Sequence, residues 1–426
     1  MTKLICPIEA SKLESCILQS CGIAADGDCK LQEAKGEVFA DGKGFVSVIM
    51  RFQLLWTGNG CQNLPKSVIL KRPTTEKFET LGDHVADLMN KTTLSKIHNR
   101  EVFIYNCFAK SSSPSPIKMP KLCGYQEATS DDDLGFLMVE DLSEIGISTK
   151  FLEYFSLEKV KVLLEFTASL QAFSILNPDA VSSVDDIHTP IMANMLSHFD
   201  SSVDYLRSQF FTDLQISSDQ QSFLRDRAIK MLLPMLNPEK SLEGGDRPVT
   251  PVLCYGDFQP NNLLWRKDGR GNPTDDLVAV VDYQAVHRGL PAEDVAHILY
   301  FHLPPEERRQ HQENLITFYF QKLQEKLESK RLPFGLDEFM EDYRNFIILF
   351  TAVFVGYART YVEKFKTPNA ETITLNHINC SVQDIFSSID YSHWITNTEC
   401  SCWLDLRLRR HVSCAPSGRT DGIAWD

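Results

Sequence analysis

Hydrophobic and polar positions follow two different rhythms along the chain. Up to residue 142, short apolar segments alternate with polar residues at a period of two, which is typical of half-buried strands. Residues 48–56 show this alternation, and residues 67–71 and 134–142 add short apolar runs. From Ser156, whose hydroxyl is a common N-cap, apolar residues recur at helical spacing instead. The pattern predicts a β-rich part followed by a mainly helical part.

The helical part contains one stretch that is apolar on all sides, residues 346–357. About 12 residues are too few to span a bilayer, which needs roughly 20, and they are typical of a helix buried in a core. Aromatic side chains on and just after this stretch either pack in the core, which we favour, or line a substrate pocket. They are Phe350, Phe354, Tyr357 and Tyr361.

A segment near residues 251–298 interrupts the helical pattern and carries the candidate chemistry. An apolar lead-in ends at Asp257, and Asn262 follows five residues later. A new apolar stretch, a Gly- and Asp-rich turn and a strongly β-prone run then lead to Asp282. This order predicts a loop with a carboxylate and an amide, then a hairpin-like return that delivers a second carboxylate. Phosphoryl transfer from ATP needs one carboxylate for the substrate hydroxyl, and an amide and a carboxylate for Mg²⁺.

The β-rich part offers three further candidates. Gly42 and Gly44 lie in a turn before residues 48–56 and form either an ordinary hairpin turn or a loop over phosphates. The run 67–71 ends in Lys71, which either faces solvent or contacts the phosphates of ATP. Glu101, on a predicted helix, is either solvated or the partner of that lysine.

Two short motifs carry a resemblance to a known family. Tyr255-Gly-Asp257 with Asn262, and Asp282-Tyr-Gln284, stand at the expected separation. At these residues the chain resembles the kinase-like phosphotransferases, the superfamily of choline kinases and aminoglycoside phosphotransferases. More narrowly, it resembles the ecdysteroid-kinase-like (CHK-kinase-like) branch, over about residues 35–390. The resemblance implies an α+β, bilobal protein-kinase-like fold with a small β-rich N-lobe and a large, mainly helical C-lobe.

The resemblance also implies roles for the residues of the N-lobe. Lys71 would contact the α- and β-phosphates of ATP, held by Glu101, and the turn with Gly42 and Gly44 would cover the phosphates. The adenine would meet backbone groups at the hinge between the lobes, which the family places at an apolar strand followed by Glu-Asp-Leu. Here that sequence is Glu140-Asp141-Leu142, and the Asp141 carboxylate is equally suited to capping the next turn.

In the C-lobe, the resemblance assigns Asp257 to orient and deprotonate the substrate hydroxyl, and Asn262 and Asp282 to coordinate Mg²⁺. Asp294 would brace the catalytic loop by hydrogen bonding, while His287 and His297 are expected to be packing or surface residues. Tyr255 departs from the family, which usually has His there in a structural role. Gln284 follows the ecdysteroid-kinase-like branch and leaves open how many Mg²⁺ ions bind. Asp257, Asn262 and Asp282 complete the predicted site.

Composition and charge limit the classes of partner and the cellular compartments that the sequence fits. The net charge of −14 over 426 residues disfavours a non-specific nucleic-acid role, which calls for a basic face. The 12 cysteines are scattered without a metal-type Cys-x-x-Cys pair, and the first residues are too weakly apolar for a signal peptide. These features predict a cytoplasmic protein with reduced thiols and no membrane span. No protein partner is predicted.

The domain organisation expected from these observations has four parts: a leader at residues 1–34, the N-lobe at 35–142, the C-lobe at 143–395, and an atypical tail at 396–426 that lacks periodicity. The predicted activity is phosphorylation of a small-molecule alcohol with ATP and Mg²⁺. An ecdysteroid or sterol-like, a choline-like or a xenobiotic acceptor remain open. The alternative is an inactive nucleotide-binding pseudokinase or scaffold. A protein kinase is disfavoured because no Asp-Phe-Gly and Ala-Pro-Glu activation segment follows Asp282.

Overall fold

A computed structural model of the protein describes most of the chain. The described residues are 8–24, 28–38, 47–75, 90–110, 117–130, 133–150, 153–182, 184, 188–209, 213–235, 251–364 and 370–388. Two predictions fall outside them: the turn with Gly42 and Gly44, and the tail at 396–426.

The N-terminal part is built on a five-stranded sheet with the order β1-β2-β3-β5-β4. Every described strand pair in it is antiparallel. Its strands are β1 (Lys30–Val38), β2 (Ser47–Thr57), β3 (Ser67–Pro73), β4 (Leu122–Gln126) and β5 (Phe136–Glu140). The alternation predicted for residues 48–56 is confirmed, because Met50, Phe52 and Leu54 are buried on one face of β2.

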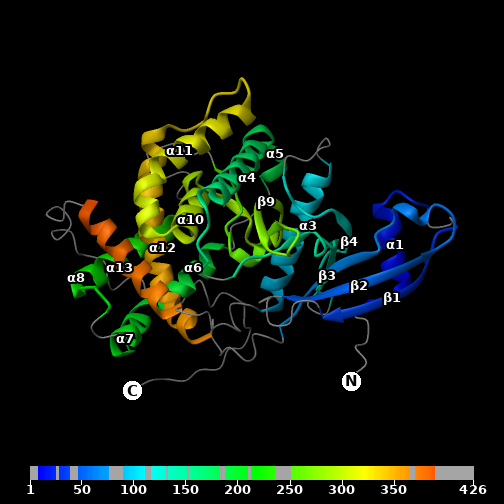
Figure 1. The fold of residues 1–426 in the computed structure, drawn as a ribbon, viewed down its shortest axis with the longest axis horizontal. Helices are drawn as coiled ribbons and strands as arrows, with labels where there is room; N and C mark the ends of the chain where they lie inside the picture. Colours follow the sequence, from blue (N-terminus) through cyan, green and yellow to red (C-terminus); the bar gives the residue numbers. More distant parts are fainter. Residues whose placement is uncertain are drawn as a thin grey trace, which may run out of the picture.

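Helix α1 (Ala10–Ser20) covers this sheet, and α3 (Lys91–Lys110) connects it to the rest of the molecule (Figure 1). Leu13 and Ile17 of α1 pack with Phe52 in a small core that belongs to the sheet. Val102 and Phe108 of α3 join the larger core of the helical part instead. The leader is therefore packed on the sheet, and the sheet itself begins at Lys30, five residues earlier than the pattern suggested.

The helical part begins where predicted. The Ser156 hydroxyl accepts a hydrogen bond from the Lys159 N–H at 3.2 Å and caps the first helix. The helices are α4 (Leu157–Leu176), α5 (Pro178–Val181), α6 (His188–Ser197), α7 (Phe199–Gln209), α8 (Ser218–Met235), α10 (Ala292–His302), α11 (Pro305–Leu327), α12 (Leu336–Lys364) and α13 (Ala370–Ser388). Helix α12 contacts α6, α7, α8, α10 and α13. Phe350 and Phe354 are each 2% exposed, so core packing of these two rings is confirmed.

Short strands form the segment that interrupts the helical pattern, and β6 (Gly146–Ile147) pairs with them. Strands β6, β8 (Leu263–Lys267) and β9 (Pro273–Val280) form a three-stranded sheet. Strand β7 (Val252–Cys254) pairs with β10 (His287–Gly289). Single 3-10 turns follow β2, precede β8 and follow β9; they are η1 (Cys61–Asn63), η2 (Pro260–Asn262) and η3 (Tyr283–Ala285). The predicted hairpin is confirmed, and so is the predicted α+β division into a β-rich N-terminal part and a helical C-terminal part.

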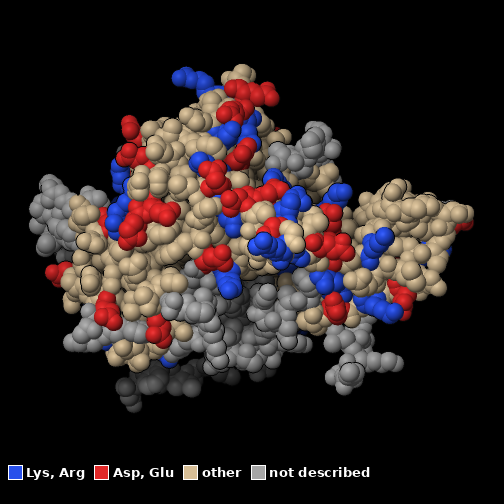
Figure 2. All heavy atoms as spheres, in the orientation of Figure 1, with Lys and Arg blue, Asp and Glu red and all other residues tan. Residues whose placement is uncertain are grey.

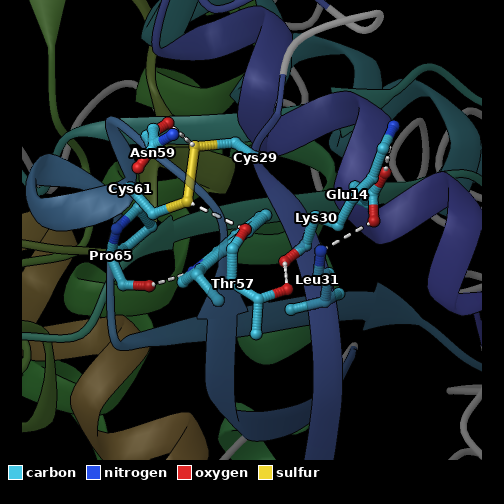
Figure 3. The surroundings of a disulfide bond; sticks show 9 residues. Glu14, Cys29, Lys30, Leu31, Thr57, Asn59, Cys61 and Pro65 are labelled. Carbon is cyan, nitrogen blue, oxygen red and sulfur yellow. Dashed lines mark hydrogen bonds and ion pairs between the residues drawn. A yellow bond between two sulfur atoms is a disulfide. The ribbon is translucent and has the colours of Figure 1, made fainter.

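One prediction about the cysteines is wrong. Cys29, just before β1, and Cys61, at the start of η1, form a disulfide with a Cα–Cα distance of 5.7 Å (Figure 3). The bond ties the start of β1 to the segment after β2, at the end of the pair where Lys30 faces Thr57. Glu14 of α1 accepts a hydrogen bond from the Leu31 N–H at 2.8 Å. The sequence hides this pair because its two cysteines are 32 residues apart and meet only when β1 and β2 form a sheet.

The surface carries charges of both signs. On the face drawn in Figure 2, Lys and Arg side chains are interspersed with Asp and Glu, and they leave no broad basic area on that face. None of the described helices combines the length and apolar character that a bilayer crossing needs.

Candidate active site

The β8–β9 hairpin brings two site residues together that are 20 positions apart in sequence. Leu263 pairs with Val280 at the open end of the hairpin. Just beyond this pair, the Val281 N–H donates to the Asn262 carbonyl oxygen at 2.9 Å. The next residue in sequence, after the end of β9, is Asp282. An antiparallel hairpin therefore places the amide and the second carboxylate at the same end, as the sequence predicted.

Asp257 reaches this end from β7. Its carboxylate Oδ2 accepts a hydrogen bond from Asn262 Nδ2 at 2.9 Å, and the same Nδ2 donates to the Asp257 carbonyl at 3.1 Å. Because Nδ2 faces Asp257, the Asn262 Oδ1 faces away from it, where it accepts a hydrogen bond from Asn261 at 2.9 Å. Asn262 is 3% exposed, and hydrogen bonds engage both ends of its amide.

The charge on Asp257 is poorly compensated. Burial, and then the nearby Asp282 carboxylate, raise the pKa of Asp257 to about 7. The Asn262 hydrogen bond and Lys71 oppose this increase but do not cancel it. A carboxyl group that is partly exposed and titrates near neutral pH can act as a general base.

Lys71 lies on the other side of the site, on β3. Its Nζ is 2.9 Å from Glu101 Oε2 and 2.8 Å from Asp282 Oδ1. Burial alone would lower the pKa of Lys71, but the charges of Asp282 and Glu101 outweigh that effect and raise it. Lys71 is 9% exposed and Glu101 is 1% exposed, so neither the solvent-facing lysine nor the solvated glutamate is realised.

Glu101 links α3 to the second carboxylate. Besides Lys71, its Oε1 accepts the backbone N–H of Tyr283 at 3.1 Å. Burial raises the pKa of Glu101 to about 7, with Lys71 opposing the increase. Asp282 itself has φ 64°, a left-handed conformation that is uncommon for a residue other than glycine. Bonds on both sides of Asp282 hold its strained backbone, and such strain is typical of functional sites.

Asp294 holds the catalytic loop from behind. Its two carboxylate oxygens accept the backbone N–H groups of Tyr255 at 2.7 Å and Gly256 at 3.0 Å. Burial raises the pKa of Asp294 to about 7 even though both hydrogen bonds lower it. Gly256 has φ 78°, and a Cβ there would lie 2.9 Å from the Ala285 carbonyl oxygen, so the turn requires glycine.

Two further residues fasten this loop, and neither was predicted to do so. The Tyr255 hydroxyl donates to the Val281 carbonyl at 2.5 Å, which ties the catalytic loop to the residue before Asp282. His302 Nε2 lies 2.6 Å from the Phe258 carbonyl, and burial lowers the pKa of His302 to about 4, so it is neutral and donates there. Only the departure of Tyr255 from the family pattern pointed to either.

At the hinge candidate, the side chains of both acids are already engaged. Asp141 accepts hydrogen bonds from Ser67 Oγ at 2.6 Å and from the Ser143 N–H at 3.0 Å, and forms an ion pair with Arg51 at 3.0 Å. Asp141 thus caps the turn after β5, which is the structural alternative for this residue. The Glu140 carboxylate accepts the Lys121 N–H at 3.3 Å. Any adenine contact here would come from the backbone.

Comparison with known proteins gives this site a family. A family model described as "Uncharacterized oxidoreductase dhs-27", DUF1679, matches residues 24–393. The chain belongs to the DUF1679 family. This is the ecdysteroid-kinase-like family, so the resemblance drawn from the two motifs is confirmed.

Two curated relatives come from Caenorhabditis elegans. The first, "Uncharacterized oxidoreductase dhs-27", is 26% identical over 321 residues, which are 71% of this chain and 37% of the relative. The second, "Uncharacterized kinase-like protein D1044.1", is 24% identical over 324 residues, which are 74% of this chain and 80% of the relative. This DUF1679 chain thus spans little more than a third of the first relative. Among solved structures, a choline kinase from Cryptosporidium parvum is 13% identical, with a TM-score of 0.43 and coverage of 83% of this chain and 90% of that chain.

Proposed function

We propose that the protein is a phosphotransferase that moves the γ-phosphoryl group of ATP to a hydroxyl group of a small molecule. The observation that carries this proposal is the contact of Lys71 with both Glu101 and Asp282, next to the Asp257–Asn262 pair. Lys71 and Asp282 are 211 positions apart in sequence and lie within 2.8 Å of each other. A lysine held between two carboxylates, beside a third carboxylate with a raised pKa, is the constellation that phosphoryl transfer requires.

Each residue has a distinct proposed role. Lys71 would exchange its contact with Asp282 for one with the ATP phosphates and keep its ion pair with Glu101. Asp257 would orient the acceptor hydroxyl toward the γ-phosphorus and take its proton as the new P–O bond forms, while the P–O bond to the β-phosphate breaks and ADP leaves. Because the transition state is loose, positioning and charge neutralisation would carry most of the rate acceleration.

The donor set at the hairpin end suits Mg²⁺. Asn262 offers an amide oxygen and Asp282 offers carboxylate oxygens, and Mg²⁺ prefers oxygen ligands and usually keeps several waters. The Asp282 side chain is 31% exposed, which leaves room for phosphate oxygens in the remaining positions. A bound Mg²⁺ would neutralise charge on the transferring phosphoryl group.

The acceptor is proposed only as a class, a small-molecule alcohol. An ecdysteroid or sterol-like hydroxyl, a choline-like amino alcohol and a xenobiotic alcohol all suit the chemistry. We also propose the lobe boundaries expected from the sequence, residues 35–142 and 143–395, with the ATP site between the two lobes. A cytoplasmic location is proposed from the sequence, although the Cys29–Cys61 disulfide is unusual in a reducing compartment. Alkylation of free thiols at extraction, followed by reduction and a count of the newly exposed thiols, shows whether Cys29 and Cys61 are reduced in the cell. Reduced cysteines are expected in the cytoplasm.

Two rival functions are less well supported. The word oxidoreductase belongs to a relative of which this chain matches only 37%. A dinucleotide-binding fold needs a largely parallel sheet, whereas the strand pairs of the described N-terminal sheet are antiparallel. A pseudokinase remains the second candidate. The presence of Lys71, Asp257, Asn262 and Asp282 in one cluster favours an active enzyme over it.

The test is ADP release by the purified protein with Mg²⁺ and ATP against a panel of alcohols that includes ecdysteroids, choline, ethanolamine and glycosides. Acceptor-dependent ADP release that disappears in Asp257→Asn would support the kinase and identify its acceptor class. Mg²⁺·ATP binding without any turnover would favour the pseudokinase. Absence of nucleotide binding would refute both.

A further inference from the structure

A second cluster of reactive side chains lies behind the catalytic loop. Cys254 and His287 are direct partners in the β7–β10 pair, and Glu293 lies in the first turn of α10. The exposed fractions of these residues are 0%, 0% and 1%. One donor atom from each, a thiol sulfur, an imidazole nitrogen and a carboxylate oxygen, lie within 4.8 Å of one another. This cluster is separate from Asp257, Asn262 and Asp282.

The three donor atoms converge on one point. Gly289 follows His287 on β10, and a Cβ at Gly289 would lie 2.6 Å from Glu293 Oε2, 2.9 Å from Cys254 Sγ and 3.1 Å from His287 Nε2. No side chain can therefore occupy position 289 without displacing all three groups. Thiol, imidazole and carboxylate are thus packed together against the same glycine.

The imidazole of His287 is oriented as in a metal ligand. Its Nδ1 lies 2.9 Å from the Ala285 carbonyl oxygen, to which it must donate, because a carbonyl can only accept. This hydrogen bond directs Nε2 into the cluster, where it lies 3.0 Å from Glu293 Oε1. Metal-bound histidines almost always donate their other N–H to a carbonyl or carboxylate in this way.

Charge balance also allows a cation in this cluster. Glu293 is followed by Asp294, so two carboxyl groups at 1% and 0% exposure stand side by side at the start of α10. A protonated His287 paired with Glu293 would compensate one charge, while the Cys254 thiol donates to the Leu290 carbonyl oxygen at 3.4 Å. A divalent cation bound by a thiolate, a carboxylate and a neutral imidazole gives a net charge of zero.

We propose that Cys254, His287 and Glu293 form a buried zinc site that fastens β7, β10 and α10 together behind the catalytic loop. Sulfur, imidazole and carboxylate form a ligand set that suits Zn²⁺ rather than Mg²⁺. Binding displaces the proton of the Cys254 thiol, which is released to solvent, and forms the Zn–S bond. Cys254, His287 and Glu293 would supply three ligands, and the second oxygen of Glu293 would take the fourth position of tetrahedral zinc.

The test is the metal content of the full-length, tag-free protein after dialysis against metal-free buffer, measured by mass spectrometry. We expect about one zinc per chain in the wild type and at least a tenfold lower content in Cys254→Ala. Cys123→Ala is the matched control, because Cys123 is also a buried free cysteine but lies in the N-terminal sheet. It should keep the zinc of the wild type. This outcome does not depend on kinase activity.

A second measurement needs no variant. Wild-type protein stripped of metal and loaded with Co²⁺ should develop an intense near-ultraviolet absorption from thiolate-to-cobalt charge transfer, which carboxylate and imidazole ligands alone do not give. Wild-type protein that contains no zinc and shows no such band with added Co²⁺ would overturn the proposal. In that case the cluster would be a buried His287–Glu293 ion pair only. Zinc retained in full by Cys254→Ala would overturn it as well.

Discussion

The catalytic loop separates two sets of carboxyl groups that look alike in sequence and differ in their surroundings. Asp257 and Asp282, in front of the loop, are partly exposed and contact side chains. Asp294, behind it, is 0% exposed and accepts two backbone N–H groups. Burial raises the pKa of both Asp257 and Asp294 to about 7. The raised pKa is therefore common to a proposed base and a brace, and access to substrate distinguishes them.

The largest expected effect comes from the front of the loop. Asp257→Asn should lower kcat by about 10³-fold, because general-base catalysis contributes roughly 10² to 10⁴. The free energy of unfolding at pH 8 should not fall, since the substitution removes a poorly compensated charge and keeps the shape of the side chain. Steady-state kinetics and urea unfolding measure the two quantities.

Asp337→Asn is the control, because Asp337 is exposed in the first turn of α12, far in sequence from the site. It should match the wild type in both assays. Turnover by Asp257→Asn within tenfold of the wild type would remove Asp257 from the chemistry.

Lys71 sharpens the comparison because it contacts both a buried and a partly exposed acid. Lys71→Met should lower kcat/KM for ATP by about 10²-fold, as expected when one charge-stabilising group is lost. It should also destabilise the fold by about 3 kcal/mol, because Glu101 stays buried without its cation. Adding Glu101→Gln to this variant should restore stability but not activity. Recovery of activity in the double variant would contradict a phosphate-binding role for Lys71.

Behind the loop, Asp294→Ala should affect the stability of the fold more than the turnover rate. Two buried N–H groups would lose their acceptor, at about 1–3 kcal/mol each, so unfolding should become easier by roughly 3 kcal/mol. The fall in kcat should be smaller than in Asp257→Asn, because the loop is loosened rather than deprived of its base. Urea unfolding beside steady-state kinetics tests this, and a stable but inactive Asp294→Ala would remove the distinction between front and back.

Sequence reasoning reached the front of the loop more easily than the back, for a physical reason. Asp257, Asn262 and Asp282 are marked by their types and spacing, and the hairpin that joins them forms locally. The pairing of Lys71 with Glu101 needed the family resemblance, because it spans 30 positions and two elements. The His302 contact and the Cys29–Cys61 disulfide arise only from tertiary packing, which leaves no pattern along the chain.

The pH dependence follows from the raised pKa of Asp257. The carboxylate is the active form, so kcat/KM for ATP, which reports the free enzyme, should rise with pH through about 7 and level off above it. Below that pH it should fall by about tenfold per unit. Bound Mg²⁺ stabilises the carboxylate, so kcat should level off at a lower pH than kcat/KM. A flat kcat/KM profile between about pH 5.5 and 8 would contradict Asp257 as the proton acceptor.

The smallest expected effect concerns Tyr255, which lies between the carboxyl groups in front of the loop and Asp294 behind it. Tyr255 donates its hydroxyl to the Val281 carbonyl, and its ring lies 4.8 Å from that of Phe258 and 5.5 Å from that of Tyr283. Tyr255→Phe keeps the ring and loses one hydrogen bond, which should cost about 1 kcal/mol of stability.

Because Tyr255 steadies the residue before Asp282 and contacts no reacting group, kcat of Tyr255→Phe should stay within about threefold of the wild type, as one hydrogen bond of positioning allows. Tyr255→His, which restores the residue usual in the family, should also remain active. Urea unfolding and steady-state kinetics on the two variants separate the possible roles. A large loss of kcat in Tyr255→Phe with unchanged stability would assign the hydroxyl to the chemistry, and Tyr255 would then belong with Asp257 at the front of the loop.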